Sequence, residues 1–101
     1  MHIGILGFGN ENKALLKFLK KEKAYKNANF WILDKNENLK LPKGVGSILG
    51  KNYLKNLNNF DIIFRSPGVP YNLKEITEAR KKGVKISSAI KLFFEKVKKK
   101  T

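Results

Sequence analysis

The segment IGILGFG at residues 3–9 decides the fold class of this chain. Ile3 to Leu6 is an apolar run rich in branched side chains that is ended by glycines. This pattern predicts a short buried strand that enters a tight turn. Helical periodicity begins directly afterwards and extends over about residues 11–23. The apolar face of this predicted helix is formed by Ala14, Leu15, Phe18 and Leu19.

Further apolar runs follow along the chain and predict strands at residues 30–33, 45–49, 61–64 and 84–86. Helices are expected as a short segment around residues 53–57, as a segment from Leu73 that ends at Gly83, and as a final segment over residues 89–97. Five short strands that alternate with helices predict an open parallel sheet with helices on both faces. The expected fold is therefore a Rossmann-like α/β domain.

The chain has 101 residues, enough for one domain and too few for a second domain of ordinary size. It contains no cysteine and one histidine, His2, so a disulfide framework is excluded and a zinc site is not expected. Its 42% hydrophobic residues fit a folded protein. No apolar run approaches the roughly 20 residues that cross a bilayer, so we expect a cytoplasmic protein with no membrane contact.

The formal net charge is +14, and all but two of the 22 basic residues are lysines. Most lysines fall on polar positions of the predicted helices, where a solvated surface explains them. Few arginines are available for bidentate phosphate contacts. Trp31 and the phenylalanines occupy expected core positions. A nucleic-acid-binding protein stays as an alternative, because so basic a domain attracts polyanions at low salt.

Ligands of open α/β sheets bind at the carboxyl ends of the strands, which directs attention to three loops. The first, GFGNEN at residues 7–12, is a partial dinucleotide fingerprint in which Asn12 stands in the place of the third glycine. Its glycines would let the backbone approach a diphosphate at the start of the following helix. An unliganded strand–helix turn is the alternative.

The second loop begins at Asp34, near the position where an acidic side chain often accepts hydrogen bonds from a ribose. The alternative for Asp34 is the capping of local amides. The third loop follows the strand at 61–64 and contains Ser66, for which no catalytic base is near in sequence. The sequence around Gly50 and Lys51 departs from a P-loop, so no ATP-phosphate site and no catalytic residue is predicted.

These segments together resemble the N-terminal domain of the Mur ligases, most closely the MurD-type members, which add D-glutamate to UDP-N-acetylmuramoyl-L-alanine. The resemblance extends over nearly the whole chain. Its most specific part is the strand that leads into SPGVP at 66–70, followed by a helix, the Gly-Val strand and the Leu-Phe-Phe helix, because a plain Rossmann domain does not require that order. The matching segments are ILGFG at 5–9, Asp34 after a strand, DIIFRSPGVP at 61–70, GVKI at 83–86 and IKLFF at 90–94.

The resemblance implies that residues 1–101 form a single N-terminal domain that binds the UDP part of the substrate and does not catalyse alone. In the full-length ligase of peptidoglycan biosynthesis, ATP and Mg²⁺ would belong to a central domain, and a C-terminal domain would bring the amino acid. Neither domain lies in this chain, so the chain itself is expected to hold no cofactor and no metal.

By position, the resemblance also implies which residues face the nucleotide. Gly7, Gly9, Asn10, Glu11 and Asn12 would face the diphosphate, Asp34, Lys35 and Asn36 the uracil or ribose, and Ser66, Pro67 and Gly68 would border the nucleotide. The carboxylate of Glu11 would stand near the phosphates unless it turns away. An NAD(H)-binding module of the Rossmann type is the remaining alternative.

Overall fold

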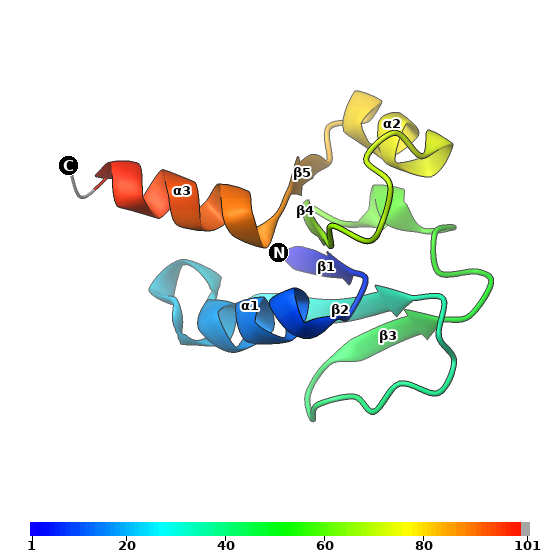
Figure 1. Ribbon diagram of the computed structural model, residues 1–101, viewed down its shortest axis with the longest axis horizontal. Helices are drawn as coiled ribbons and strands as arrows, with labels where there is room; N and C mark the ends of the chain where they lie inside the picture. The colour runs from blue at the N-terminus through cyan, green and yellow to red at the C-terminus, as the bar shows by residue number, and fades with distance from the viewer. Residues whose placement is uncertain (100–101) are drawn as a thin grey trace.

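The computed structural model describes residues 1–99, in which helices and strands alternate along the chain (Figure 1). The strands are β1 (His2–Leu6), β2 (Asn29–Asp34), β3 (Gly46–Leu49), β4 (Ile62–Arg65) and β5 (Lys85–Ser87). The α-helices are α1 (Asn10–Lys21), α2 (Lys74–Lys81) and α3 (Ala89–Lys99), and two short 3₁₀ helices are η1 (Lys23–Tyr25) and η2 (Leu57–Asn59).

The strands form one parallel sheet in the order β3-β2-β1-β4-β5. The chain first builds outward from β1 to β3 and then returns to add β4 on the other side of β1. This reversal places a topological switch point between β1 and β4, where open α/β sheets bind their ligands. The prediction of a Rossmann-like parallel sheet is confirmed.

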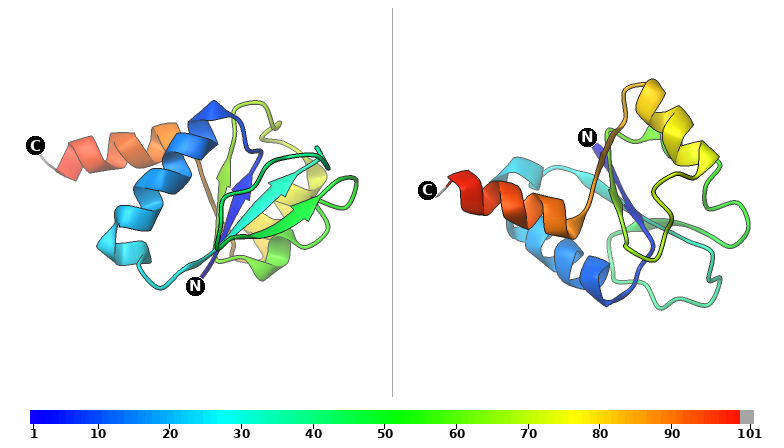
Figure 2. Two further views of the ribbon diagram at one scale, coloured as in Figure 1. Left: turned by 90° about the horizontal axis from the view of Figure 1, so that it is seen from below. Right: turned by 45° about the horizontal axis from the view of Figure 1, so that its top comes forward.

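Helices cover both faces of the sheet, as expected (Figure 2). The alternation of β4 shows how: Ile62 and Phe64 belong to the apolar cluster that includes the buried leucines of α1, whereas Ile63 belongs to the cluster that includes Ile76 of α2. Residues of β1 and β2 also divide between the two clusters. The sheet is therefore the middle layer of three, as a nearly continuous apolar run in each strand predicts.

In the second half of the chain, one sequence expectation needs correction and another is confirmed. The short helix expected around residues 53–57 is wrong, since residues 51–56 form turns and the 3₁₀ helix η2 begins at Leu57. The helix expected from Leu73 was predicted to end at Gly83, and this end is confirmed for α2. Gly83 adopts a φ of +97°, and its N–H donates to the carbonyl of Arg80, a typical arrangement just past a helix end.

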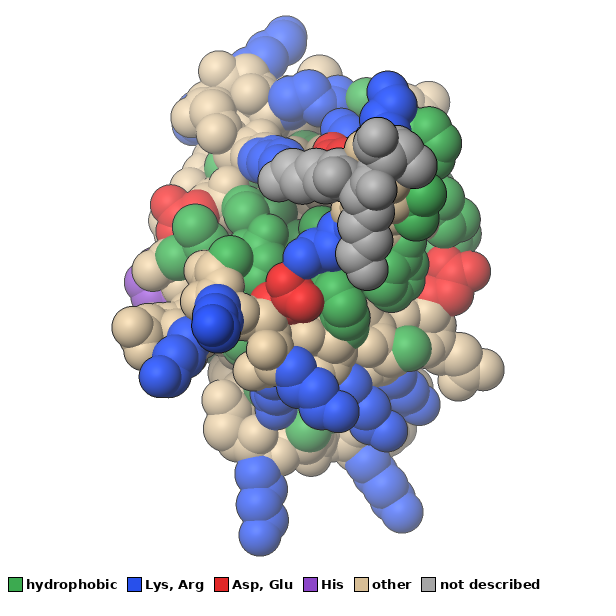
Figure 3. Space-filling view, turned by 90° about the vertical axis from the view of Figure 1, so that its left-hand side faces the viewer, with side chains coloured by type: hydrophobic (Ala, Val, Ile, Leu, Met, Phe, Trp, Pro, Cys, Tyr) green, Lys and Arg blue, Asp and Glu red, His purple; other side chains and the backbone are tan. Residues whose placement is uncertain are grey.

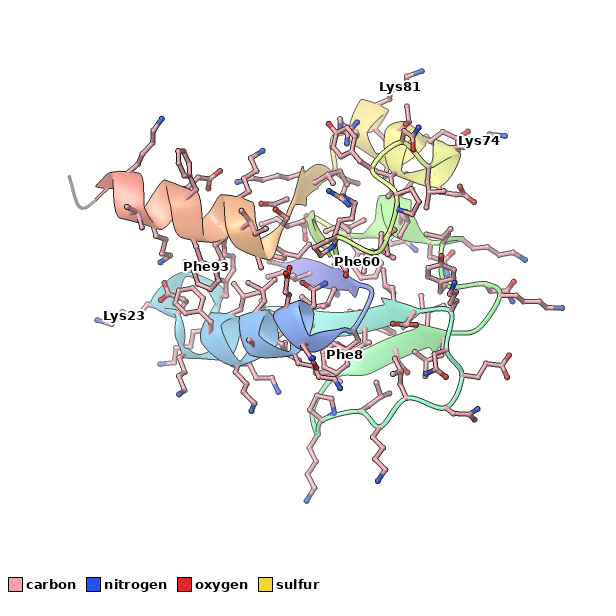
Figure 4. The ribbon with its side chains drawn as sticks, in the orientation of Figure 1. Phe8, Lys23, Phe60, Lys74, Lys81 and Phe93 are labelled. Carbon is pink, nitrogen blue, oxygen red and sulfur yellow. The ribbon has the colours of Figure 1, made fainter. Side chains whose placement is uncertain are left out.

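The last helix, α3, is apolar on more sides than the core covers. Leu92 is buried, and Phe93 meets Phe18 of α1 edge to face with 5.4 Å between ring centroids (Figure 4). The expectation that all phenylalanines occupy core positions is wrong for two residues of this helix, because Phe93 is 44% and Phe94 62% exposed. One stripe of α3 contacts α1, and the rest of the helix extends away from the sheet (Figure 1).

The surface carries its basic residues among side chains of other kinds. On the face shown in Figure 3, several Lys and Arg side chains lie close together in the lower part, and others are interspersed with apolar and acidic ones. Within residues 1–99, no helix is both long enough and apolar enough to span a bilayer.

Candidate functional site

Three loops meet beyond the carboxyl ends of β1, β2 and β4 and surround a cavity of about 250 Å³. Parallel pairing brings them to one level, because Leu6 at the end of β1 is in register with Leu33 of β2 and with Arg65 of β4. The cavity is lined by Gly7, Phe8, Gly9, Asp34, Lys35, Tyr53, Ser66, Gly68, Val69 and Pro70. We call this space the loop cavity.

Gly7 forms the turn that leaves β1, and its conformation requires glycine. Its φ is +83°, a value that residues with a Cβ rarely adopt. A Cβ on Gly7 would also lie 2.8 Å from the Cβ of Ser66. The first and third loops therefore approach each other at a distance that no larger residue allows.

Gly9 is the N-cap residue of α1, and it provides no side chain to cap the helix. Its carbonyl accepts the first helical hydrogen bond, from the N–H of Lys13 at 2.9 Å. The space where a Cβ of Gly9 would stand is empty to 4 Å. The N–H groups of the first turn of α1, with the positive end of the helix dipole, thus begin at the mouth of the loop cavity.

Asp34 connects the first and second loops through its carboxylate. Oδ2 accepts a hydrogen bond from the N–H of Phe8 at 2.8 Å, and Oδ1 accepts one from the N–H of Asn36 at 2.9 Å. The expected alternative of local capping is therefore confirmed for Oδ1. Each carboxylate oxygen has a further lone pair and can accept a second hydrogen bond, for example from a hydroxyl group.

Asn12 lies beneath the glycine turn and is 1% exposed. Its Nδ2 donates to the carbonyl oxygen of Gly7 at 2.7 Å and has longer contacts with those of Leu6 and Phe64. Within the described residues its Oδ1 has no hydrogen-bond partner. Asn12 thus joins the ends of β1 and β4 from below and does not fill the loop cavity.

The structure brings together some of the residues predicted for the site and separates others. Glu11 is exposed on the first turn of α1 and does not line the cavity, as is also true of its neighbour Asn10. Asn36 lies in the loop after β2 and Pro67 in the loop after β4, as predicted, but neither residue lines the cavity. Those that line it are Gly7, Gly9, Asp34, Lys35, Ser66 and Gly68.

Tyr53 and Phe8 line the cavity without having been predicted to do so. Phe8 stands inside the glycine motif at the end of β1 (Figure 4), so its position follows from the motif itself. Tyr53 arrives from beyond β3, because the N–H of Gly50 donates to the carbonyl of Asp34 at 2.9 Å and returns the chain toward the second loop. Gly50 has a φ of +88° in this turn, and from the sequence it was considered only as part of a segment that departs from a P-loop.

The strand order and the three loops at the switch point define the class, an open α/β domain of the Rossmann type with a loop-lined cavity at its carboxyl edge. A family model described as "Mur ligase MurD-like, N-terminal domain" matches residues 1–88. The chain belongs to this family.

Curated relatives agree with the family. The chain is 32% identical over 101 residues to a UDP-N-acetylmuramoylalanine--D-glutamate ligase of Acetivibrio thermocellus, and the match covers 92% of this chain and 21% of the relative. Ligases of the same name from Clostridium tetani and from Clostridium botulinum strain Hall are 33% and 32% identical, with the same coverage of 92% and 21%. The chain thus spans about a fifth of the length of these relatives.

Proposed function

We propose that this domain binds the UDP part of UDP-N-acetylmuramoyl-L-alanine in the loop cavity, as the substrate-binding part of a MurD-type ligase. The observation that carries the proposal is the position of that cavity, between the uncapped start of α1 and the loops after β2 and β4. Its volume of about 250 Å³ fits part of a ligand. Complete small-molecule sites commonly measure about 300–1,000 Å³, so the rest of the substrate would extend beyond the domain.

The diphosphate would lie against the turn at Gly7 and Gly9. Backbone N–H groups at a helix N-terminus bind phosphate without a basic side chain, and an open Gly9 lets the anion approach them. Lys35 lines the same cavity and adds a positive charge. Glu11 adds a negative charge nearby, but its exposure lets the carboxylate point to solvent.

The nucleoside would lie between the loops after β2 and β4. Asp34 can accept a hydrogen bond from a ribose hydroxyl or a base N–H in addition to the two backbone N–H groups that it already binds. Tyr53 also lines the cavity, and its ring would provide an aromatic surface for a base. Ser66 and Gly68 would border the nucleotide from the opposite loop.

The domain would contribute to the ligase reaction by positioning, since it would anchor one end of a long substrate while its far carboxylate meets ATP elsewhere. Within residues 1–99, no group of three or more acidic or histidine side chains gathers to hold a metal ion. As the family resemblance implies, we assign ATP and Mg²⁺ to other parts of a ligase, and binding without catalysis to this chain. A cytoplasmic location, where ATP is available, belongs to the same proposal.

Titration of the isotope-labelled chain with UDP, followed by the NMR signals of its backbone amides, tests the proposal. Signals of residues 8–12, of 34–36 and of Gly68 should shift, and those of α3 should not. Parallel titrations with NADH, and with RNA at two salt concentrations, test the two alternative functions, an NAD(H)-binding module and a nucleic-acid-binding protein. Absence of shifts at millimolar UDP, or stronger shifts with NADH or with RNA, would overturn the assignment.

A further inference from the structure

Arg65, the last residue of β4, connects both ends of the turn that follows it. Its Nη1 donates to the carbonyl oxygen of Ser66 at 3.2 Å and to that of Val69 at 2.6 Å. The N–H of Val69 returns to the carbonyl of Ser66 at 3.0 Å, so the turn is also closed by its own backbone. One guanidinium thus fixes the position of the turn at residues 66–69.

This turn is one wall of the loop cavity. Ser66, Gly68 and Val69 all line the cavity. Gly7 lies directly beside this turn, because a Cβ built on it would meet the Cβ of Ser66 at 2.8 Å and Cγ2 of Val69 at 3.1 Å. The two residues whose carbonyls Arg65 binds are therefore the two that approach Gly7 most closely.

The guanidinium of Arg65 is itself held by an aromatic ring. Its Cζ lies 5.5 Å from the ring centroid of Tyr71, and the Cζ of Arg80 lies 4.4 Å from the same centroid. These are the two arginines of a chain whose other basic residues are lysines. Guanidinium groups can stack on a ring and still donate hydrogen bonds from their edge, which an ammonium group does not do equally well.

We infer that Arg65 is a positioning residue for nucleoside diphosphate binding, which it supports by fixing the wall at residues 66–69 against Gly7. The inference rests on the proposed function. Arg65 does not line the cavity, so it acts through the carbonyls of Ser66 and Val69 and not by touching the ligand. Both hydrogen bonds come from one nitrogen, Nη1, while the plane of the guanidinium lies near the ring of Tyr71, so the length and the stacking of this side chain are what matter.

The test compares UDP affinity in the full 101-residue chain and in three variants. Arg65→Lys keeps the positive charge and loses the planar guanidinium, whereas Arg65→Met loses both. We expect both substitutions to weaken UDP binding about tenfold, with the slope of affinity against salt unchanged in Arg65→Lys. The control Arg80→Lys changes the other arginine at the Tyr71 ring, and binding should stay within about twofold.

A further readout separates positioning from general loss of structure. The amide signals of Gly68 and Val69 should shift in unliganded Arg65→Lys, while those of residues 8–12 and 34–36 stay in place. Wild-type affinity in Arg65→Lys, or equal losses in Arg65→Lys and Arg80→Lys, would overturn the inference. If no chain, wild type included, responds to UDP, it is the proposed function that fails.

The wild-type chain gives an independent answer if Arg65→Lys does not fold. Protons on a guanidinium that donates to two carbonyls exchange slowly with water. The side-chain signals of Arg65 should therefore be visible by NMR at neutral pH, while those of exposed Arg80 exchange quickly. Equally rapid exchange of both arginines would also contradict the inference.

Discussion

The carboxylate of Asp34 accepts a hydrogen bond from the backbone N–H of Phe8, with 2.8 Å between the nitrogen and Oδ2, although 26 positions separate the two residues. This contact joins the loop after β2 to the turn after β1. A second contact, from the N–H of Asn36 to Oδ1, shapes the loop itself. Asp34 therefore has a structural role that precedes any role in ligand binding, and the two roles can be measured separately.

Replacement of Asp34 should reduce both stability and binding. In Asp34→Asn, one oxygen becomes a donor that faces a backbone N–H, so we expect the free energy of unfolding to fall by about 1–3 kcal/mol. Urea unfolding followed by the fluorescence of Trp31, the single tryptophan, measures this. UDP affinity should fall about tenfold or more.

Asp61→Asn is the matched control for Asp34→Asn. Asp61 also accepts a backbone hydrogen bond with its carboxylate, from the N–H of His2 at 2.7 Å, but at the other end of the sheet. This control should change stability by less than about 1 kcal/mol, because the contact is exposed, and it should leave UDP binding as it was. Equal effects of the two substitutions on UDP binding would exclude a local role for Asp34.

Alanine should destabilise the protein at one of the two glycines of the first turn and leave its stability unchanged at the other. Gly7→Ala places a Cβ at positive φ and against Ser66, so a loss of about 2 kcal/mol or more in unfolding free energy is expected. Gly9→Ala meets no neighbour and should leave stability within about 0.5 kcal/mol of the wild type.

The UDP affinity of Gly9→Ala tests the role of this glycine in ligand binding. The methyl group of Gly9→Ala would stand where a phosphate approaches the start of α1, so this stable variant should bind UDP several-fold more weakly. Calorimetric titration gives the affinity, and thermal unfolding confirms the intact fold. A Gly9→Ala variant with normal affinity would move the phosphate away from this helix terminus.

Asn12 should contribute more to stability than its surface neighbour Asn10. Asn12→Ala leaves the carbonyl of Gly7 without its 2.7 Å donor in a buried place, and we expect a loss of about 1–3 kcal/mol in urea unfolding. Asn10→Ala, at an exposed position of the same helical turn, should change the value by less than about 0.5 kcal/mol. Similar values for both would show that the buried amide contributes nothing net.

Glu11→Gln should strengthen UDP binding slightly while it weakens the helix. Removing a negative charge beside the start of α1 reduces repulsion of a diphosphate, and we expect about a two- to threefold gain in affinity at low salt that fades by 0.5 M. The lost interaction with the helix dipole costs about 0.3–1 kcal/mol of stability. Glu95→Gln on α3 is the control that leaves binding as it was, and a gain of the same size there would reveal a mere effect of net charge.

Two apolar residues of α3 should differ sharply in what they contribute to stability. Leu92 is 7% exposed, and Leu92→Ala should cost about 2–5 kcal/mol in unfolding free energy. Phe94 is 62% exposed, and Phe94→Ser should change stability by less than about 1 kcal/mol and should lower self-association at high concentration. Urea denaturation measures the stability and light scattering the self-association. A larger loss of stability in Phe94→Ser than in Leu92→Ala would show that α3 packs through its Phe94 face instead.

Much of the fold could be predicted because the strands are apolar runs bounded by glycine, proline or charge. The run at Ile3–Leu6 and the glycine spacing after it correctly predict β1, its turn and α1. Helical periodicity was less informative for α3, since it identifies apolar positions without identifying what covers them. Phe93 and Phe94 therefore appeared to be core residues when they are largely exposed.

The candidate site was harder to predict than the fold, because its contacts link residues that are distant in sequence. The glycine pattern identifies the turn but does not show that Asn12 is buried under it and donates to the carbonyls of Leu6 in β1 and Phe64 in β4. Tyr53 reaches the cavity through a turn at Gly50 in a segment without clear periodicity. The role of Arg65 depends on a carbonyl four residues away, which no local propensity encodes.

The common register of Leu6, Leu33 and Arg65 has an evolutionary consequence. Loops that leave the sheet at one height can exchange residues, lengthen or shorten while the buried strands below keep their sequence. A lineage could thus acquire a new ligand through changes in three short surface segments, and its hydrophobic interior would record ancestry more faithfully than its choice of ligand.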